Sequence, residues 1–379
     1  MTRAPFDKLV GQPLVSQFLS SAVENNRVNH ACLFIGPIGS GKNEAARALA
    51  MALVCRQKGC GACDDCIRVM RGSHPDVKVI DPEGAHGYIT EQIHDLIRDT
   101  NLTPIRAQVK VYIITRADLL YGTPANAFLK TLEEPPNRVV FILLARTRES
   151  VLATIFSRCQ VIAFRTIPEE EAIQALISTG RVIFKDARIA LAATGGSMFR
   201  AREYLGSSAR RDTRIRVLEI IERLAEADSL EIIEAARDLL VFLKQPLDEV
   251  LLEQERQLAE GKEYLSKGAL TALEQRHKRA LTNREREVLE EAFNICRSWL
   301  HDCLLVQIGR QSEVVNTDYQ HNIQKTAFSC DVAALVRSIR AVDEAEQRIH
   351  YNVSVQSIVE ALFLTLRDEL GRGSADQVY

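Results

Sequence analysis

The chain has 379 residues, of which 46% are hydrophobic and 26% are charged, and its formal net charge is −2. This composition is ordinary for a soluble globular protein, and the length suits two or three domains of about 150 residues each. A membrane-spanning protein is excluded, because no apolar run approaches the roughly 20 residues that a span needs.

Charge and cysteine content narrow the class of protein further. Residues 1–166 carry 20 Lys and Arg against 15 Asp and Glu, and the remainder carries 28 against 35, an imbalance too mild to predict nucleic-acid binding by itself. The N-terminal sequence MTRAPFDKLVGQ has no apolar signal core, so we expect the protein to stay in the cytoplasm. Nine cysteines in a cytoplasmic protein favour metal binding or packing over disulfides.

Short apolar runs alternate with helical stretches over residues 1–166. The runs have the length and composition of buried parallel strands. Their alternation with helices predicts an α/β doubly wound domain. The five runs are ACLFI (31–35), DVKVI (76–80), KVYIITRA (110–117), VVFILLA (139–145) and CQVIAF (159–164).

The first run is followed by GPIGSGKN, residues 36–43, and then by the helical stretch NEAARALAMALV. A glycine-rich turn between a strand and a helix is the context of a phosphate-binding loop, and Lys42 could reach the β- and γ-phosphates. Asn43 stands where a hydroxyl would bind Mg²⁺. The alternative is a glycine-rich turn without a ligand. The predicted nucleotide-binding residues are Gly36, Gly39, Gly41, Lys42 and Asn43.

Four cysteines follow this helix with the spacing C-x4-C-x2-C-x2-C. Four thiolates suit a tetrahedral structural Zn²⁺, although an iron–sulfur cluster could use the same ligands. A redox pair is less favoured, because the stretch leaves a helix rather than opening one. The predicted zinc-binding insertion, at about 55–66, contains Cys55, Cys60, Cys63 and Cys66. Four other cysteines, in apolar segments, are predicted to pack in the core: Cys32, Cys296, Cys303 and Cys330.

The run at 110–117 lacks the acids of a hydrolysing P-loop enzyme. In such an enzyme an apolar strand ends in Asp-Glu, which holds Mg²⁺ and polarises water. Here those positions are Thr115 and Arg116, and Asp118 lies beyond the end of the strand. The sequence therefore predicts weak or absent binding of ATP with Mg²⁺, and no turnover.

Ser157, Arg158 and Cys159 precede the last apolar run of this domain. An Arg at a domain edge can reach the γ-phosphate of a neighbouring subunit as an arginine finger. The alternative for Arg158 is an exposed residue in a turn.

The rest of the chain reads as helix. Residues 167–208 predict a small unit of two to four helices, and residues 209–379 predict long helices with apolar residues three and four apart. No proline occurs after Pro246. Residues 245–290 are highly charged and predict a solvent-exposed extension.

Several of these segments together resemble the bacterial DNA polymerase III clamp-loader subunits of the AAA+ family. LKTLEEPP followed by SRC is very specific, and the resemblance covers most of residues 1–166. The helical remainder is similar only in layout, which implies a lid domain over 167–208 and a collar domain over 209–379. The matching segments are LVGQ, NHACLFIGPIGSGK, the four-cysteine insertion, SHPDV, NAFLKTLEEPP, FILLA and SRC.

Two kinds of subunit share this pattern. The γ/τ type hydrolyses ATP and carries a Ser or Thr after the loop lysine and Asp-Glu after the strand, whereas the δ′ type has degraded catalytic positions. With Asn43, Thr115 and Arg116, this chain resembles the δ′ type. Thr147 then matches the first sensor position, and the second sensor arginine falls on Phe199, beside Arg200.

The resemblance implies a hetero-oligomer with γ/τ and δ subunits that opens a sliding clamp and places it on primed DNA. It implies a structural Zn²⁺ and an Arg158 that acts in trans on a neighbour's ATP. A catalytically active γ/τ-type ATPase is the alternative. A zinc-dependent nucleic-acid binder is a third interpretation, disfavoured because aromatic residues do not flank the cysteines.

Overall fold

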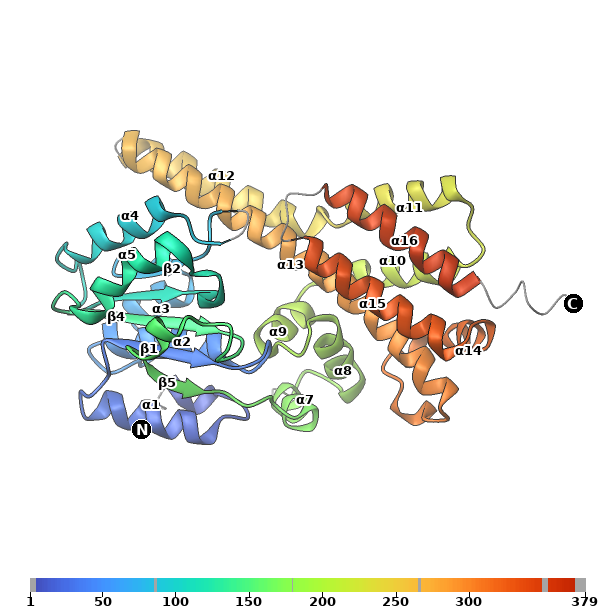
Figure 1. The fold of residues 1–379 in the computed structure, drawn as a ribbon, viewed down its shortest axis with the longest axis horizontal. Helices are drawn as coiled ribbons and strands as arrows, with labels where there is room; N and C mark the ends of the chain where they lie inside the picture. Colours follow the sequence, from blue (N-terminus) through green and yellow to red (C-terminus); the bar gives the residue numbers. More distant parts are fainter. Residues whose placement is uncertain (1–4, 85–86, 179, 265–266, 350–353, 372–379) are drawn as a thin grey trace, which may run out of the picture. The chain divides into compact units, whose positions relative to one another are not determined.

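The computed structural model describes residues 5–84, 87–178, 180–264, 267–349 and 354–371 (Figure 1). The chain forms two compact units. The first contains Met1–Thr179 and Gly196–Phe199, and the second contains Gly180–Gly195 and Arg200–Tyr379. The predicted three-part division at residues 166 and 208 stays a prediction. Among the described helices, none is both long and apolar enough to span a membrane.

A five-stranded parallel sheet forms the centre of the first unit, with the strand order β2-β3-β4-β1-β5. The predicted α/β fold is confirmed, and each strand lies within a predicted apolar run. β4 is buried along its whole length, because helices cover both faces of the sheet. The strands are β1 (Ala31–Ile35), β2 (Val77–Ile80), β3 (Lys110–Ile114), β4 (Val139–Ala145) and β5 (Gln160–Ala163).

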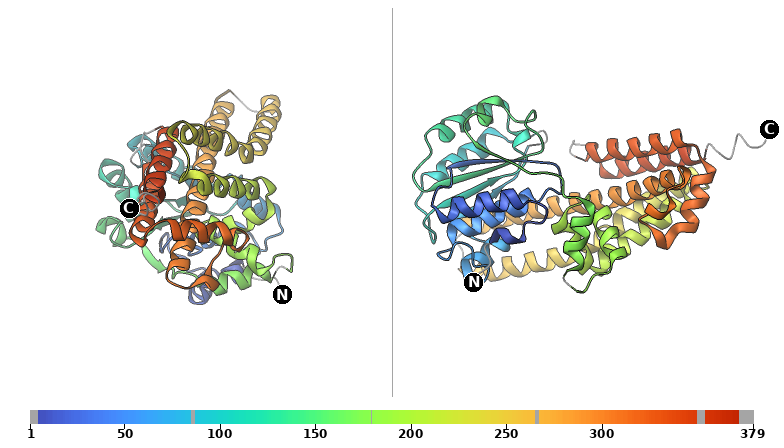
Figure 2. Two further views of the ribbon diagram at one scale, coloured as in Figure 1. Left: turned by 90° about the vertical axis from the view of Figure 1, so that its right-hand side faces the viewer. Right: turned by 90° about the horizontal axis from the view of Figure 1, so that it is seen from below.

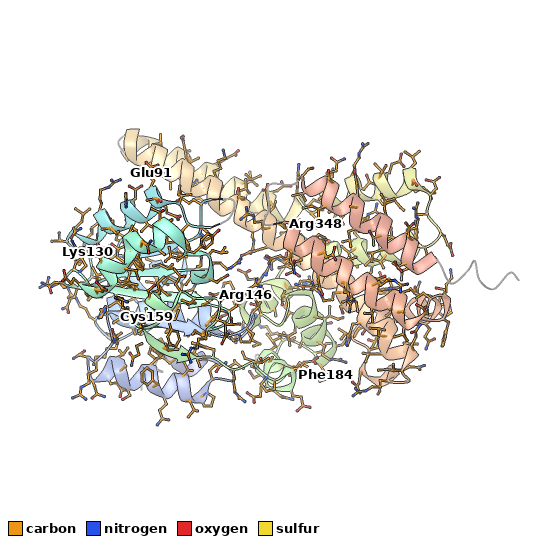
Figure 3. The ribbon with its side chains drawn as sticks, in the orientation of Figure 1. Glu91, Lys130, Arg146, Cys159, Phe184 and Arg348 are labelled. Atoms are coloured by element: carbon orange, nitrogen blue, oxygen red, sulfur yellow. The ribbon has the colours of Figure 1, made fainter. Side chains whose placement is uncertain are left out.

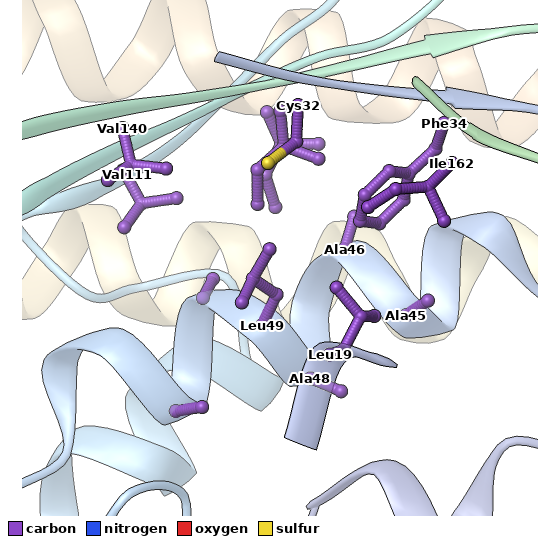
Figure 4. Close-up of a cluster of buried hydrophobic side chains, with 14 of the residues drawn as sticks. Leu19, Cys32, Phe34, Ala45, Ala46, Ala48, Leu49, Val111, Val140 and Ile162 are labelled. Atoms are coloured by element: carbon purple, nitrogen blue, oxygen red, sulfur yellow. The ribbon is translucent and has the colours of Figure 1, made fainter. Parts of the chain in front are cut away.

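The two faces of the sheet carry separate hydrophobic cores. On one face, α1 (Pro13–Glu24) and α2 (Lys42–Val54) pack against strand residues that include Cys32 and Phe34 (Figure 4). On the other face, α4 (Thr90–Thr100) and α5 (Gly122–Glu133) pack against strand residues such as Phe141 (Figure 1). Shorter elements complete this unit: η1 (Pro5–Lys8), α3 (Asp64–Met70), η2 (Ala117–Leu119), α6 (Ala153–Phe156) and α7 (Glu169–Ile177).

The described residues of the second unit form helices joined by turns. α13 is 41 residues long and packs against α8, α10, α14 and α15, with Trp299 fully buried. The helices are α8 (Phe184–Ala193), α9 (Met198–Gly206, which begins in the first unit), α10 (Ser208–Leu224), α11 (Ser229–Phe242), α12 (Gln245–Tyr264), α13 (Lys267–Gln307), η3 (Gln311–Glu313), η4 (Thr317–Tyr319), α14 (Gln320–Ser329), α15 (Val332–Arg348) and α16 (Val355–Gly371).

The highly charged segment 245–290 corresponds to α12 and the first half of α13. These two helices pack along one another, and Figure 2 shows them side by side. Gln254 on α12 donates a hydrogen bond from Nε2 to the carbonyl of His277 on α13, at 3.2 Å. The segment is therefore a pair of packed helices.

Candidate functional site

The glycine-rich loop joins β1 to α2, as the sequence predicts. Gly39 and Gly41 have φ angles of 80° and 82°, a left-handed conformation that favours glycine. A Cβ atom on Gly36 would lie 2.7 Å from the Cβ of Phe164, so a side chain cannot fit there. All three glycines are therefore required by the backbone path of the loop.

The amide side chain of Gln12 ties this loop to the end of β5. Its Nε2 donates to the carbonyl of Ser40 at 2.9 Å and to that of Arg165 at 2.6 Å. Gln12 is only 3% exposed, so these bonds lie in the protein interior. Gln12 ends the LVGQ segment, but the sequence does not reveal this role, because the two segments that Gln12 joins are far apart in the chain.

Lys42 bonds to its own loop. Its Nζ donates to the carbonyl of Gly36 at 2.8 Å and to that of Pro37 at 2.9 Å. Burial, together with the positive charge of nearby Arg146, lowers the pKa of Lys42 to about 8. The ammonium therefore stays mostly protonated at pH 7, in a place where it could meet an anion.

The predicted sensor residue Thr147 lies at the same edge of the sheet. Ile35 pairs with Ala145, so the segments that follow β1 and β4 leave the sheet side by side. Thr147 is exposed, and its carbonyl accepts a hydrogen bond from Ser150 Oγ at 2.8 Å. Figure 3 labels Arg146, the residue before Thr147.

The segment after β3 holds its polar groups in internal contacts. Thr115 Oγ1 donates to Asp81 Oδ1 at 2.5 Å. Arg116 has a φ angle of 50°, and its Nε and Nη2 each lie 3.2 Å from Asp118 Oδ2. The Asp118 carboxylate is thus paired with the guanidinium of Arg116.

Arg158 lies just beyond α6, next to Cys159, which is labelled in Figure 3. Its guanidinium binds Glu133 through Nε, at 2.7 Å, and through Nη2. Nη1 donates to the carbonyl of Thr154 at 2.9 Å. The Arg158 side chain is 32% exposed, so it can still be reached from outside the chain.

The four predicted cysteine ligands come together in space. Their sulfur atoms all lie within 4.8 Å of one another, and Cys55 Sγ is 3.8 Å from Cys60 Sγ and 3.6 Å from Cys63 Sγ. Tetrahedral coordination with bonds of about 2.3 Å places sulfur atoms roughly 3.8 Å apart. The donor set and the spacing therefore fit Zn²⁺.

Backbone N–H groups favour the thiolate form of two of the four cysteines, Cys55 and Cys60. The N–H of Gln57 donates to Cys55 Sγ at 3.3 Å, and that of Cys63 donates to Cys60 Sγ at 3.4 Å. Burial raises the pKa of Cys55, but backbone N–H groups, first that of Cys60, outweigh it and lower this pKa to about 6. A metal ligand must be a thiolate, so the backbone around Cys55 and Cys60 favours binding, whereas the pKa of Cys63 is raised and burial raises that of Cys66.

The SHPDV segment anchors the cysteine module to the sheet. Asp76 is buried, and its carboxylate accepts three backbone N–H bonds, from Ile105, Arg106 and Ala107, at 2.6, 2.7 and 2.8 Å. The Arg106 side chain then reaches α3, where Nη2 lies 2.8 Å from Asp64 Oδ2. The sequence alone does not reveal this structural role of Asp76.

The residues near the expected second sensor position make other contacts. Within the first unit, Arg47 lies over the Phe199 ring at 5.1 Å. Within the second unit, Arg200 Nη1 lies 2.9 Å from Glu290 Oε2, and Nη2 donates to the carbonyl of Glu287 at 2.8 Å. The Arg200 guanidinium is therefore engaged by α13.

Two family profiles match this chain. The family described as "DNA polymerase III, delta subunit" matches residues 11–168, and "DNA polymerase III, delta subunit, C terminal" matches residues 269–366. A solved structure, that of a DNA polymerase III gamma subunit-related protein from Thermotoga maritima, has 16% identity and a TM-score of 0.44 over 93% of this chain and 99% of that one.

Curated relatives agree with these profiles. DNA polymerase III subunit delta′ of Bacillus subtilis is 27% identical over 360 residues, which cover 94% of this chain and 96% of the relative. DNA polymerase III subunit tau of the same organism is 35% identical over 172 residues, 44% of this chain. The matched part spans 30% of the length of tau. The chain belongs to the DNA polymerase III clamp-loader subunits of the AAA+ family, and it is similar to the δ′ type over nearly its whole length.

Proposed function

We propose that this chain is the δ′ subunit of a clamp loader that places a sliding clamp on primed DNA, and that it does not hydrolyse ATP itself. The pairing of Arg116 with Asp118 carries this proposal. A guanidinium cannot accept a proton, so Arg116 cannot polarise the attacking water as an acid does in a hydrolysing enzyme. Asn43 also lacks the hydroxyl that would bind Mg²⁺.

Arg158 is the residue that acts on a neighbouring subunit. Its planar fork of donors suits the charge that develops on a γ-phosphoryl group during transfer. The loop of its own chain lacks the acid and the hydroxyl that hydrolysis needs, so the finger would serve ATP bound by another subunit. The partial exposure of Arg158 supports this role.

The partners follow from membership of the family. The chain resembles both δ′ and tau, which supports a hetero-oligomer of related subunits, namely γ/τ and δ. The sliding clamp and primed DNA are the substrates of this assembly. The helical second unit would contribute the contacts that hold the subunits together, because amphipathic helices can bury apolar stripes against a neighbour.

Zn²⁺ would be held by Cys55, Cys60, Cys63 and Cys66, the cluster described above. When bound, the ion would supply structural cross-linking rather than chemistry, since four thiolates leave no open position. The cluster would fix the start of α3, and Arg106 would then hold α3 against the loop ordered by Asp76.

A catalytically active γ/τ-type ATPase is the second candidate. The observation in its favour is the identity with tau, 35% over 172 residues, against 27% with δ′ over 360 residues. The two candidates differ in the ATPase activity of the isolated chain, which only the γ/τ type would possess.

Substitution of Arg158 tests the proposed function. We expect Arg158→Ala to leave folding, metal content and assembly unchanged, and to lower the DNA-stimulated ATPase activity of the reconstituted complex. The decrease should be smaller than the roughly 10³–10⁵ found for GTPase fingers, because other subunits complete the remaining sites with their own arginines. Arg158→Lys should lower this ATPase activity nearly as much, because the ammonium of Lys does not reproduce the planar fork of guanidinium donors.

Arg27→Ala is the matched control, because Arg27 is an exposed arginine of the same unit outside the site. A complex with Arg158→Ala that hydrolyses ATP and loads clamps at the unmutated rate would contradict the finger. Arg158 would then be an exposed turn residue.

A further inference from the structure

The contact between Glu133 and Arg158 joins two elements of the first unit. Glu133 is the last residue of α5, and Arg158 follows α6, 25 residues later. Nε of Arg158 donates to Glu133 Oε1 at 2.7 Å, and Nη2 contacts the same oxygen. The carboxylate therefore binds the guanidinium along its Nε–Nη2 edge.

A second set of contacts holds the guanidinium from the α6 side. Nη1 lies 2.9 Å from the Thr154 carbonyl oxygen and 3.3 Å from Ser157 Oγ. A guanidinium has five N–H donors, two of them on Nη2. Across the described parts of the chain, the bonds of Nη2 go to Glu133 alone, so one of its N–H groups stays available to an outside acceptor.

We propose that Glu133 is the positioning residue of Arg158, an inference that rests on the proposed function. Glu133 binds the Nε–Nη2 edge of the guanidinium, and the α6 backbone accepts a hydrogen bond from Nη1. The remaining N–H group of Nη2 is then presented to the phosphate bound by a neighbouring subunit. The side chain then loses little rotamer freedom when the subunits assemble, because its orientation is already set.

The exposure of the pair separates positioning from a role in stability. Side-chain exposure is 32% for Arg158 and 47% for Glu133. Ion pairs this open to water contribute little to folding. Removal of Glu133 should therefore change the orientation of Arg158 while the first unit stays folded.

The chain offers a matched control at the next position. Glu134 is also exposed, and it lies in the same EEPP sequence. The contacts described for Arg158 go to Glu133 and to α6, not to Glu134. Glu134→Ala removes the same charge from the same surface without touching the guanidinium.

The experiment measures ATPase kinetics of the complex reconstituted with Glu133→Ala, Glu134→Ala, Arg158→Ala or the double variant Glu133→Ala/Arg158→Ala. We expect Glu133→Ala to remove roughly half or more of the Arg158-dependent rate, through kcat and with KM for ATP unchanged. Glu134→Ala should match the unmutated complex. The double variant should equal Arg158→Ala alone, because Glu133 acts only through Arg158.

Each other outcome has a definite meaning. A normal rate for Glu133→Ala beside a reduced rate for Arg158→Ala overturns the positioning role and leaves the finger intact. A double variant slower than Arg158→Ala shows that Glu133 acts elsewhere, which also overturns the proposal. A normal rate for Arg158→Ala overturns both the finger and its positioning. Thermal unfolding of isolated Glu133→Ala, compared with Glu134→Ala, verifies that the fold is kept.

Discussion

Two buried polar side chains, Gln12 and Asp76, hold loops of the first unit in place through hydrogen bonds to the backbone. Gln12 joins the glycine-rich loop to the end of β5. Asp76 accepts hydrogen bonds from three consecutive backbone N–H groups beside the cysteine module. Their partners lie between 28 and 153 residues away for Gln12, and about 30 for Asp76. Periodicity reports only near neighbours, so the sequence predicts the glycines and cysteines of the site but not these connections.

Asp76 provides a prediction with a defined pH dependence. Burial raises the pKa of Asp76, but the three backbone N–H bonds outweigh it and hold the pKa below its ordinary value. We expect Asp76→Asn to lower the free energy of unfolding at pH 7 by roughly 2–3 kcal/mol, because an amide is a poorer acceptor than a carboxylate. The stabilisation from a depressed pKa exists above the unfolded value of about 4 and disappears as pH falls through the folded value.

Urea unfolding of the two proteins at pH 7 and near pH 3 measures this difference. Asp95→Asn is the control, since the Asp95 side chain is 61% exposed. A difference between wild type and Asp76→Asn that persists undiminished in acid would show that the contribution is steric rather than electrostatic.

At the scale of elements, prediction succeeded where the pattern is local. All five strands lie in predicted apolar runs, and three short helices occupy residues 169–206, where two to four were expected. The sequence did not predict which of the two units contains α8. Arg188 on α8 donates from Nη2 to the carbonyl of Glu313 at 2.8 Å, and α8 packs on α13, so this helix belongs to the second unit. The helical periodicity of a segment shows which face is apolar, but it does not identify a packing partner so far along the chain.

The cysteine module yields the prediction at this scale. We expect one Zn²⁺ per chain, and Cys63→Ser should lower both the metal content and the midpoint of thermal unfolding, because binding energy of a structural site is folding energy. Elemental analysis of protein purified without added metal measures the first quantity. Cys330→Ser, which alters a thiol outside the cluster, should keep the zinc. Iron in place of zinc, or no metal, would contradict the assignment.

At the scale of the whole molecule, the two compact units suggest two separable tasks. The sheet and its helices carry the loop, the cysteines and Arg158, while the second unit is helical and carries buried polar contacts of its own. Arg210 and Glu291, each almost fully buried, lie 3.0 Å apart and join α10 to α13. We propose that this pair specifies how α10 packs on α13 and so supports a role of the second unit in assembly.

This division predicts the behaviour of a fragment. Residues 1–179 should fold and retain zinc but fail to join the complex, because we propose that the second unit carries the subunit contacts. A fragment that ends at 208 should be less stable, since it includes α8 without α13. Circular dichroism and co-purification with partner subunits measure the two properties. If residues 1–179 co-purified as well as the full chain does, the second unit would not be the oligomerisation domain.

The last prediction concerns the isolated full-length chain, which we expect to show negligible ATP hydrolysis. Lys42 bonds to its own loop, and Arg116, which we propose stands in the position of the polarising acid, is held by Asp118. Each ~1.4 kcal/mol of lost transition-state stabilisation lowers the rate tenfold.

Asn43→Ser alone should not restore turnover, because it returns a metal ligand and leaves water without a base. Phosphate release is measured for wild type, Asn43→Ser and a known ATPase at equal concentration. Turnover by wild type at the rate of that ATPase would favour the γ/τ type. If only Asn43→Ser hydrolysed ATP, the missing acid would not be the cause of the inactivity of wild type.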